Sequence, residues 1–359
     1  MVEIQLGPIS PTLLEPIAVK VSVLNGKIID VNLKADYVYR KIEDLARGRN
    51  VFSLLPLVER VCGICSFAHI TPYCQAVEHI CSFEISEYAK LTRVILAELE
   101  RIQSHLLYLF EVATHIRERY SYSIKILKIR EEILKLLEKI GGKRIHSGMN
   151  IIGGVRCNIN TKMKRIIREK LDIITPKIKK LWEIEHNLSK KEGIGVLSRE
   201  MAKSIAVGPT ARASGVDFDV RRDMPYAAYD KLDLDVKVRT EGDVKARACL
   251  HLEETLESIN LIRRALDFLP NFNEKFVLPR IVSGEAKSYV EAPRGKNEYY
   301  VRLNESGNIE KLEIKTPTYH NINIMRDILL GQNIEDLEII LVSIDPCLSC
   351  ACRVFSGSK

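Results

Sequence analysis

Tryptophan and proline are scarce in this sequence, with one Trp and 13 Pro among 359 residues. Long apolar runs are missing as well. No stretch reaches the roughly 18 apolar residues that a membrane-spanning helix needs, so we expect that the chain itself is not embedded in a bilayer. The first residues, "MVEIQLGPIS", lack the basic and apolar regions of a secretory signal. The frequent Ile, Leu, Lys and Glu residues favour a helix-rich soluble protein.

The net charge of +7 does not come with the features of a nucleic-acid-binding protein. Basic residues are densest in "KMKRIIREKLDIITPKIKK", residues 162–180, but no aromatic residues are interleaved there and no binding motif accompanies them. We therefore predict a solvated helix face or a docking surface for an acidic partner, and no nucleic-acid partner.

Hydrophobic patterning predicts a mainly α fold with peripheral β-hairpins, an α+β class. Apolar and polar residues alternate over 17–34 around Asn25-Gly26, a pair that suits the type I′ turn of a hairpin. A second hairpin is expected over 298–315. Between the hairpins the pattern is helical, and we expect helices over 88–119, 125–140, 160–190 (bent near Pro176), 197–206 and 245–268.

The absence of a repeat or a low-complexity linker predicts one domain over residues 1–359. Within it we expect an N-terminal hairpin region, a helical bundle, a β-hairpin with the C-terminal metal motif, and a short tail, over 1–45, 46–290, 291–353 and 354–359.

Nine cysteines in a chain without a secretory signal favour metal or redox chemistry over disulfides. Two pairs have the C-x-x-C spacing, Cys62 with Cys65 and Cys347 with Cys350, near opposite ends of the chain. One such pair alone could be a redox pair, half a zinc site or two core residues, but two pairs can complete a site for a soft metal. Zinc remains the alternative, although zinc ribbons usually place their pairs closer together. Unpaired cysteines expected in the core are Cys74, Cys81, Cys157 and Cys249.

The segments around both pairs resemble a known family. "ERVCGICSFAH" (59–69) and "DPCLSCACR" (345–353) are similar to the metal motifs of [NiFe]-hydrogenase large subunits, specifically the energy-converting, membrane-associated type (group 4). That type is related to the quinone-site catalytic subunit of respiratory complex I, which lacks the four cysteines that this chain keeps. The resemblance continues in "GPISPTLLEP" (7–16), "YRKIE" (39–43), "ELERIQSHL" (98–106), "ARASGVDFDVRRDMPY" (211–226), "EAPRG" (291–295) and "TPTYHN" (316–321).

The resemblance implies a nickel–iron centre held by the four thiolates. Cys62 and Cys347 would be terminal nickel ligands, while Cys65 and Cys350 would bridge nickel to an iron that carries CO and cyanide. Thiolates are soft donors that suit nickel through its redox change. His69, four residues after Cys65, would hydrogen-bond a bridging sulfur, although a lone histidine is more often a core residue.

The same resemblance assigns residues around the open side of the metal. Arg294 would place its guanidinium over the open position and polarise hydrogen or receive its proton, although its high pKa makes it a poor base. Asp345 would orient Arg294, the alternative being a purely structural ion pair. Thr318 and Thr316 could hydrogen-bond a cyanide ligand, and Pro293 would line the same pocket.

Glu15 matches the carboxylate through which protons leave the site in this family, and a surface glutamate is the plain alternative. The family's C-terminal motif often ends on a histidine that binds a second metal with a glutamate, here Glu43. Arg353 takes the place of that histidine and is expected to form an ion pair with Glu43 instead. Two departures are Lys41, where the family usually has glycine, and the helix matching 98–106, where many hydrogenases have a carboxylate and this chain has Ser104 and His105.

As the resemblance implies, the chain would cleave or form H2 heterolytically. No ligands for an iron–sulfur cluster remain, so electrons would pass to a small subunit with a [4Fe-4S] cluster and on to a ferredoxin or polyferredoxin. Membrane partners would couple the reaction to ion movement and hold the chain peripherally on the cytoplasmic side. The alternatives are a complex I-like quinone or scaffold subunit and a zinc-binding structural protein.

Overall fold

The computed structural model describes all residues except 11–12, 116–119, 187–191, 273–276 and 352–359. Helices dominate the described chain and the strands form small antiparallel sheets, which confirms the expected α+β class. No helix in these described ranges is long and apolar enough to cross a membrane.

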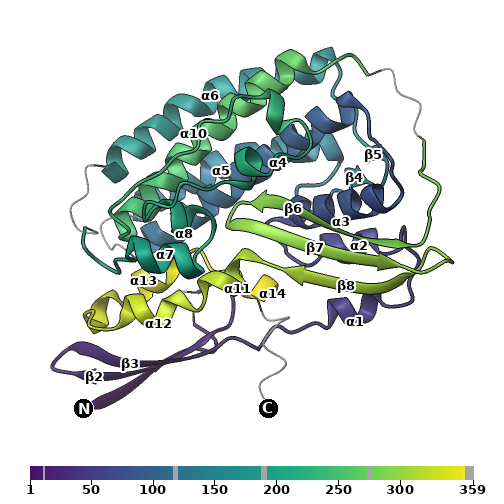
Figure 1. Ribbon diagram of the computed structural model, residues 1–359. Coiled ribbons are helices and arrows are strands. Elements are labelled where there is room, and N and C mark those ends of the chain that lie inside the picture. The colour runs from purple at the N-terminus through teal and green to yellow at the C-terminus, as the bar shows by residue number, and fades with distance from the viewer. Residues whose placement is uncertain (11–12, 116–119, 187–191, 273–276, 352–359) are drawn as a thin grey trace.

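Four long helices form a bundle in the upper half of Figure 1. Each contacts the next in the cyclic order α4, α5, α6, α10. Their bounds are α4 Glu87–Thr114, α5 Tyr120–Gly141, α6 Thr161–His186 and α10 Val244–Phe268. These bounds confirm the helices expected from the pattern; the expected ends at 116–119 and 187–190 lie outside the described residues. Side-chain caps begin two of them: Ser86 accepts from Ala89 N, and Asp243 accepts from Ala246 N.

Two three-stranded sheets confirm the two predicted hairpins. In the first, the hairpin β2 (Ala18–Leu24)–β3 (Lys27–Lys34) turns at Asn25 and Gly26, both with positive φ, as a type I′ turn requires. A short strand, β1 (Val2–Leu6), pairs with β2. In the second sheet, β7 (Gly295–Leu303) lies between β6 (Gly284–Ala292) and β8 (Ile309–Lys315).

Helix α3 (Ser66–Ile80) connects the bundle to the second sheet, because it packs on β6 and β7 and also contacts α4. Sequence patterning did not predict this helix. Every residue from Ser66 to Glu78 is buried, so this part of α3 has no solvent-exposed face whose polar residues would repeat with the helical period. Pro72 inside it further weakens the signal.

Short elements complete the fold, and those near the C-terminus lie between the bundle and the first sheet (Figure 1). They are α1 Ile42–Ala46, α2 Leu55–Glu59, β4 Asn150–Ile151, β5 Gly154–Val155, α7 Arg199–Ile205, α8 Gly208–Arg212, α9 Val220–Asp223, η2 Tyr229–Lys231, α11 Pro317–Asn321, α12 Ile324–Leu329, η3 Ile334–Asp336, α13 Leu337–Ser343 and α14 Leu348–Ala351.

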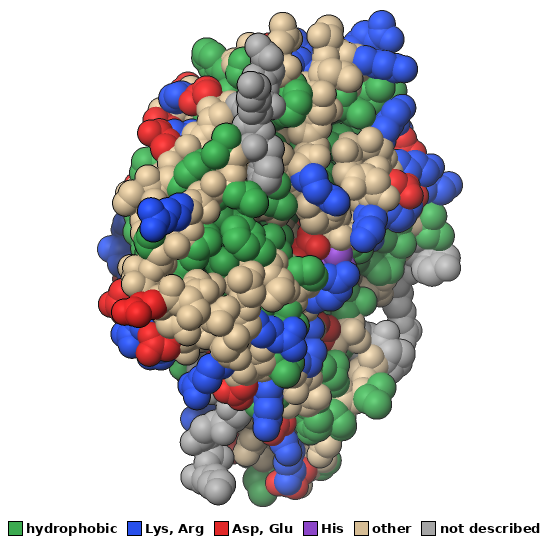
Figure 2. All heavy atoms as spheres, turned by 90° about the vertical axis from the view of Figure 1, so that its right-hand side faces the viewer, with side chains coloured by type: hydrophobic (Ala, Val, Ile, Leu, Met, Phe, Trp, Pro, Cys, Tyr) green, Lys and Arg blue, Asp and Glu red, His purple; other side chains and the backbone are tan. Residues whose placement is uncertain are grey.

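Apolar packing divides into two main clusters. The larger lies within the bundle and between it and the β6–β8 sheet, and the smaller joins the first sheet to α12 and α13. A separate small cluster contains the four motif thiols with Ala68 and Ala292. The outer surface is mixed: Figure 2 shows hydrophobic side chains gathered near the middle of one face, with Lys and Arg side chains around them.

Candidate metal centre

Both C-x-x-C pairs meet at one buried position. Cys65 lies directly before α3, while Cys347 and Cys350 flank the start of α14. The Sγ atom of Cys62 lies 3.5 Å from that of Cys347 and 3.2 Å from that of Cys65. The Sγ atoms of Cys347 and Cys350 are 3.2 Å apart. All four side chains are at most 3% exposed, so the chain closes a thiol site between its two ends.

Electrostatics within this site favour a bound cation. Hydrogen bonds from Cys347, Cys350 and Cys65 lower the pKa of the Cys62 thiol well below its usual value. Hydrogen bonds with Cys350 and Cys62, together with burial, raise the pKa of Cys347 well above its usual value. Without a cation, therefore, the thiolate of Cys62 is stabilised only while neighbouring thiols stay protonated. A metal ion would supply the missing positive charge and release the protons.

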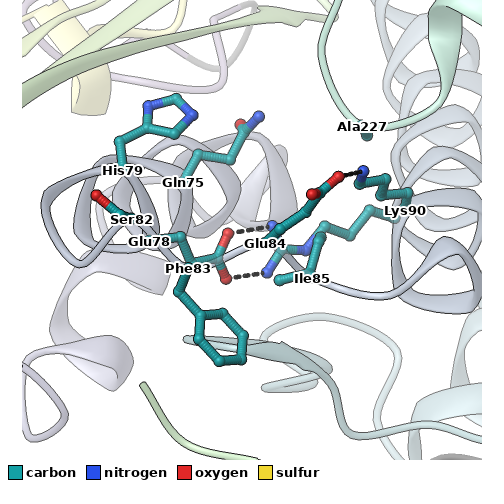
Figure 3. Close-up of a pocket in the computed structure, with 10 residues that line it drawn as sticks. Gln75, Glu78, His79, Ser82, Phe83, Glu84, Ile85, Lys90 and Ala227 are labelled. Atoms are coloured by element: carbon teal, nitrogen blue, oxygen red, sulfur yellow. Dashed lines mark hydrogen bonds and ion pairs between the residues drawn. The ribbon is translucent and has the colours of Figure 1, made fainter. Parts of the chain in front are cut away.

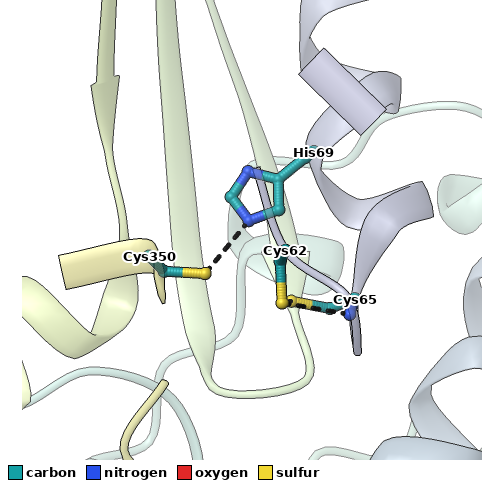
Figure 4. A group of neighbouring side chains, drawn as sticks. All are labelled: Cys62, Cys65, His69 and Cys350. Atoms are coloured by element: carbon teal, nitrogen blue, oxygen red, sulfur yellow. Dashed lines mark hydrogen bonds between the residues drawn. The ribbon is translucent and has the colours of Figure 1, made fainter. Parts of the chain in front are cut away.

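His69 points its ring into the thiol group, as Figure 4 shows. Its Nε2 lies 3.3 Å from Sγ of Cys350, and its Nδ1 lies 2.8 Å from the hydroxyl of Tyr299 and 3.4 Å from Nδ2 of Asn297. Because the asparagine amide nitrogen only donates, Nδ1 is the accepting nitrogen and Nε2 carries the proton. His69 therefore donates toward the sulfur. The ligand atoms of Cys62, Cys65, His69 and Cys350 all lie within 4.8 Å of one another.

Arg294 and Asp345 form a buried pair. The guanidinium Nη2 lies 2.5 Å from Oδ1 of Asp345, its Nε donates to the Asp345 carbonyl at 2.8 Å, and its Nη1 donates to Ser104 Oγ at 3.1 Å. Burial disfavours the charge, but Asp345 and the nearby thiols raise the pKa of Arg294 well above its usual value. Arg294 therefore stays cationic. Ser104, one of the residues that depart from the family's usual pattern, therefore contacts Arg294 directly. Pro293, next to Arg294 in the same turn, is buried.

Two threonines and a glutamate hold the backbone of the C-terminal motif. Thr316 Oγ1 donates to the Cys350 carbonyl at 3.2 Å, and Thr318 Oγ1 accepts from Cys347 N at 3.1 Å. The Glu15 carboxylate accepts from Leu348 N, from Ser349 N at 3.1 Å and from the Ser349 hydroxyl. Glu15, far away in sequence, thus reaches the turn between the two C-terminal cysteines.

Two residues at the site were missed from the sequence. Glu100 on α4 accepts from Phe67 N at 2.6 Å and from Ala68 N at 2.8 Å, so it caps α3 directly after Cys65. Arg40 joins the two motifs: it donates to the carbonyls of residues 60 and 61, at 2.8 and 2.6 Å, and to the Ser349 carbonyl at 3.0 Å. In the sequence, the only sign of either residue is that it lies inside one of the segments that resemble the family. No sequence pattern marks a carboxylate that becomes buried or an arginine that joins two distant segments.

Comparisons with known proteins match this arrangement along the chain. The family model of nickel-dependent hydrogenases matches residues 40–115. The family model of the respiratory-chain NADH dehydrogenase 49 kd subunit matches residues 119–280 and 272–353. The chain is 35% identical to the carbon monoxide-induced hydrogenase of Rhodospirillum rubrum, over 98% of this chain and 99% of that protein. It is 34% identical to the membrane-bound hydrogenase subunit alpha of Pyrococcus furiosus, over 98% and 88%.

A solved structure agrees with both. The membrane-bound sulfane sulfur reductase, an archaeal respiratory membrane complex, contains a chain that superimposes with a TM-score of 0.92 at 25% identity, covering 98% of each chain. The chain belongs to the family of [NiFe]-hydrogenase and complex I 49 kDa large subunits. Membership confirms the resemblance seen in the sequence, and the relatives include group 4 hydrogenase subunits.

The family's second metal position was expected to hold an Arg353–Glu43 ion pair here. Arg353 lies outside the described residues, so the pair stays a prediction. Glu43 Oε1 accepts from Ile314 N at 2.7 Å, which ties α1 to β8. Lys41, at the place of the family's usual glycine, has φ 51° and ψ 39°. Lysine therefore adopts the left-handed backbone that glycine would take most easily.

A surface cavity of about 420 Å³ lies away from the thiols, at the far end of α3 (Figure 3). Its base carries an ion pair in which Arg93 Nη1 and Nη2 contact the two Glu78 oxygens at 2.8 and 2.6 Å. At 1.5 Å rise per residue, Glu78 is about 20 Å along α3 from Cys65. This cavity is therefore separate from the candidate metal centre.

Proposed function

We propose that the chain is the catalytic large subunit of an energy-converting [NiFe]-hydrogenase that cleaves and forms H2 heterolytically. The observation that supports this most strongly is the convergence of four buried thiols from the two ends of the chain, with His69 donating toward Cys350. A nickel ion and an iron carrying CO and cyanide would supply the redox chemistry, held by Cys62, Cys65, Cys347 and Cys350.

The sulfurs lie close enough together to share a bound metal, since three sulfur–sulfur distances are 3.2, 3.2 and 3.5 Å. Four thiolates suit zinc as well as nickel and iron, so the distances alone do not choose the metal. The match of residues 40–115 to nickel-dependent hydrogenases favours nickel.

The surrounding residues would each have a separate task. His69 donates to the Cys350 sulfur and withdraws charge from it. Arg294 stays cationic, so it would orient and polarise the reacting molecule, while Asp345 holds its guanidinium group in position. Glu15 contacts the backbone at Leu348 and would carry protons between the centre and the surface.

Electrons would leave through a partner. In the described chain the motif cysteines are the one group of cysteines with metal-ligand geometry, so an iron–sulfur cluster would belong to a small subunit. Beyond it we expect a ferredoxin-type or polyferredoxin carrier and ion-translocating membrane subunits. These partners would hold the chain at the membrane, as the names of its membrane-bound relatives suggest, and we propose the cytoplasmic side.

A basic hollow next to the N-terminal motif suits a partner with an anionic cluster. Arg60, two residues before Cys62, lines a hollow of about 320 Å³ with Lys143, His146 and Arg156. Thiolate-ligated clusters carry negative charge, which these side chains would attract. Lys143→Glu should therefore weaken retention of the cluster-bearing subunit during purification, and unchanged retention would argue against this docking face.

Metal analysis with infrared spectroscopy tests the proposal. Nickel and iron in equal amounts, infrared bands from CO and cyanide, and hydrogen–deuterium exchange would support it. Zinc alone, or no metal, would end it. A second candidate is a quinone- or sulfur-linked subunit, favoured by the 49 kd subunit match and by the sulfane sulfur reductase likeness. Electron transfer in the assembled complex without hydrogen exchange would select that candidate.

A further inference from the structure

A tight turn between two strands carries Arg294. The last residue of β6, Ala292, pairs with the first residue of β7, Gly295, so only two residues form the turn. Arg101 on α4 holds the β6 side of this turn, because its guanidinium donates to the backbone carbonyls of residues 291 and 292, at 2.6 and 3.1 Å. The position of the Arg294 side chain therefore depends on where the fold holds the turn.

The other side of the turn lies against Gly208, the first residue of α8. A Cβ atom at Gly208 would lie 2.3 Å from the Arg294 carbonyl oxygen and 2.4 Å from Cα of Gly295. A Cβ atom at Gly295 would in turn lie 2.7 Å from the Gly208 nitrogen. Ordinary contacts of a Cβ atom begin at about 3.4 Å, so these two backbones come closer than any residue other than glycine allows.

Asn321, the last residue of α11, holds the start of α8 in this place. Its Oδ1 accepts from Val207 N at 3.0 Å, and its Nδ2 donates to the Val207 carbonyl at 3.2 Å. The amide therefore bonds both backbone groups of the residue directly before Gly208. Asn321 is 2% exposed and ends the segment "TPTYHN" (316–321), whose two threonines bond the backbone of the C-terminal metal motif. The same segment thus connects that motif with the Arg294 turn.

We propose that Gly208 and Asn321 are positioning residues for Arg294. Gly208 lets the backbone of α8 support the Arg294 turn directly, and Asn321 keeps that support in place, so the guanidinium stays aligned with Asp345 and the thiols. This inference rests on the proposed function, in which Arg294 orients and polarises the reacting molecule. Both residues act through the turn, and a displacement of about 1 Å at a reacting group can lower a rate by about a hundredfold.

Gly208→Ala tests the close contact, and Gly215→Ala is its matched control. Both glycines have positive φ, 67° and 84°, so alanine strains the backbone at either position. The surroundings of the new Cβ atom differ. At Gly208 it meets the backbone of the Arg294 turn at 2.3 Å, whereas at Gly215 it meets the flexible Arg199 side chain at 3.3 Å. Both variants should lose stability in denaturant unfolding, but only Gly208→Ala should move the Arg294 turn.

The readouts separate positioning from a general loss of structure. In the metal-loaded complex, Gly208→Ala should keep its nickel and iron, with the infrared bands of CO and cyanide shifted because a charged group beside the centre has moved. Its kcat for H2 oxidation should fall by about tenfold to a hundredfold at an unchanged KM, as when an interaction of the transition state alone is weakened. Gly215→Ala should keep the parent bands and kcat. Parent values in Gly208→Ala, or equal losses of kcat in both variants, would overturn the proposal.

A second pair of variants decides the matter if Gly208→Ala does not load its metal. Asn321→Ala releases Val207 without filling the close contact, and it should lower kcat at an unchanged KM. Asn323→Ala is the matched control, since Asn323 is exposed and its Nδ2 bonds the Tyr319 carbonyl at 3.2 Å. A parent-like kcat in Asn321→Ala would overturn the proposal. A loaded parent without hydrogen–deuterium exchange would instead refute the proposed function, and that measurement involves neither variant.

Discussion

Replacing Glu100 by glutamine should change how the stability of the protein depends on pH. Glu100 is only 6% exposed, and its oxygens accept from Phe67 N and Ala68 N at the start of α3. None of the described Lys or Arg side chains forms an ion pair with it. Burial, with a smaller contribution from the Cys62 charge, raises the pKa of Glu100 from 4.5 to about 8, although the two backbone donors act against this.

The size and sign of this pH dependence follow from the difference between the pKa of Glu100 in the folded chain and in the unfolded chain. A pKa of about 8 in the folded chain against 4.5 in the unfolded chain corresponds to about 5 kcal/mol. Because the folded chain binds this proton more tightly, the contribution is fully present below pH 4.5 and is lost as the pH rises to about 8. Glu100→Gln removes the titration. Its amide NH2 must face one backbone N–H, which costs about 1–3 kcal/mol at every pH.

Denaturant unfolding of the variant and the parent at pH 5 and pH 8 measures the difference directly. At pH 5 the variant should be less stable, and by pH 8 the gap should close or reverse, a relative change of about 3.5 kcal/mol over this pH range. Other groups, including the buried histidines, cancel in this difference. Glu84→Gln, at an exposed position, should show little change. Parallel stability curves for Glu100→Gln and the parent would refute the argument.

Three further predictions test the centre. Glu15→Gln keeps an oxygen for the backbone donors, so metal content should stay near normal while turnover and hydrogen–deuterium exchange fall strongly; parent-rate exchange would exclude Glu15 as the main proton route. Cys65→Ser should lose or distort the metal centre, whereas Cys249→Ala should keep its metal; an intact spectrum in Cys65→Ser would refute its role. Arg353→Ala and Glu43→Ala should each destabilise the loaded fold by roughly 3–5 kcal/mol, and additive losses in the double variant would contradict their pairing.

The sequence predicted those features whose signal is local. Asn25-Gly26 placed the first hairpin, and the two C-x-x-C spacings identified the four thiols that the fold brings together. Periodicity located the four bundle helices because each has one apolar face. Helix α3 was missed because it is buried on all sides, and β1 was missed because it is short and its residues 2–5 are exposed, so they show no buried face to detect.

Residues that act across long sequence distances could not be found this way. Arg40 is one of many arginines until the fold places residues 60, 61 and 349 around its guanidinium. Glu15 likewise contacts the C-terminal motif only because the fold brings the N–H groups of Leu348 and Ser349 to its carboxylate. Such roles depend on which groups a side chain meets, and composition and spacing carry no information on that.

The two carboxylates that hold the metal motifs explain why only one of them suits proton transfer. Glu100 accepts from the N–H groups after Cys65, and Glu15 accepts from those between Cys347 and Cys350, so each secures one motif. Each carboxylate also accepts from one serine hydroxyl, Glu100 from Ser66 at 3.4 Å and Glu15 from Ser349, so the hydroxyl contact does not separate them. Burial does: Glu100 is buried between α3 and α4, whereas Glu15 is only partly buried. A group that passes protons between the motif and solvent needs both contacts, so we expect a proton route at Glu15 and not at Glu100.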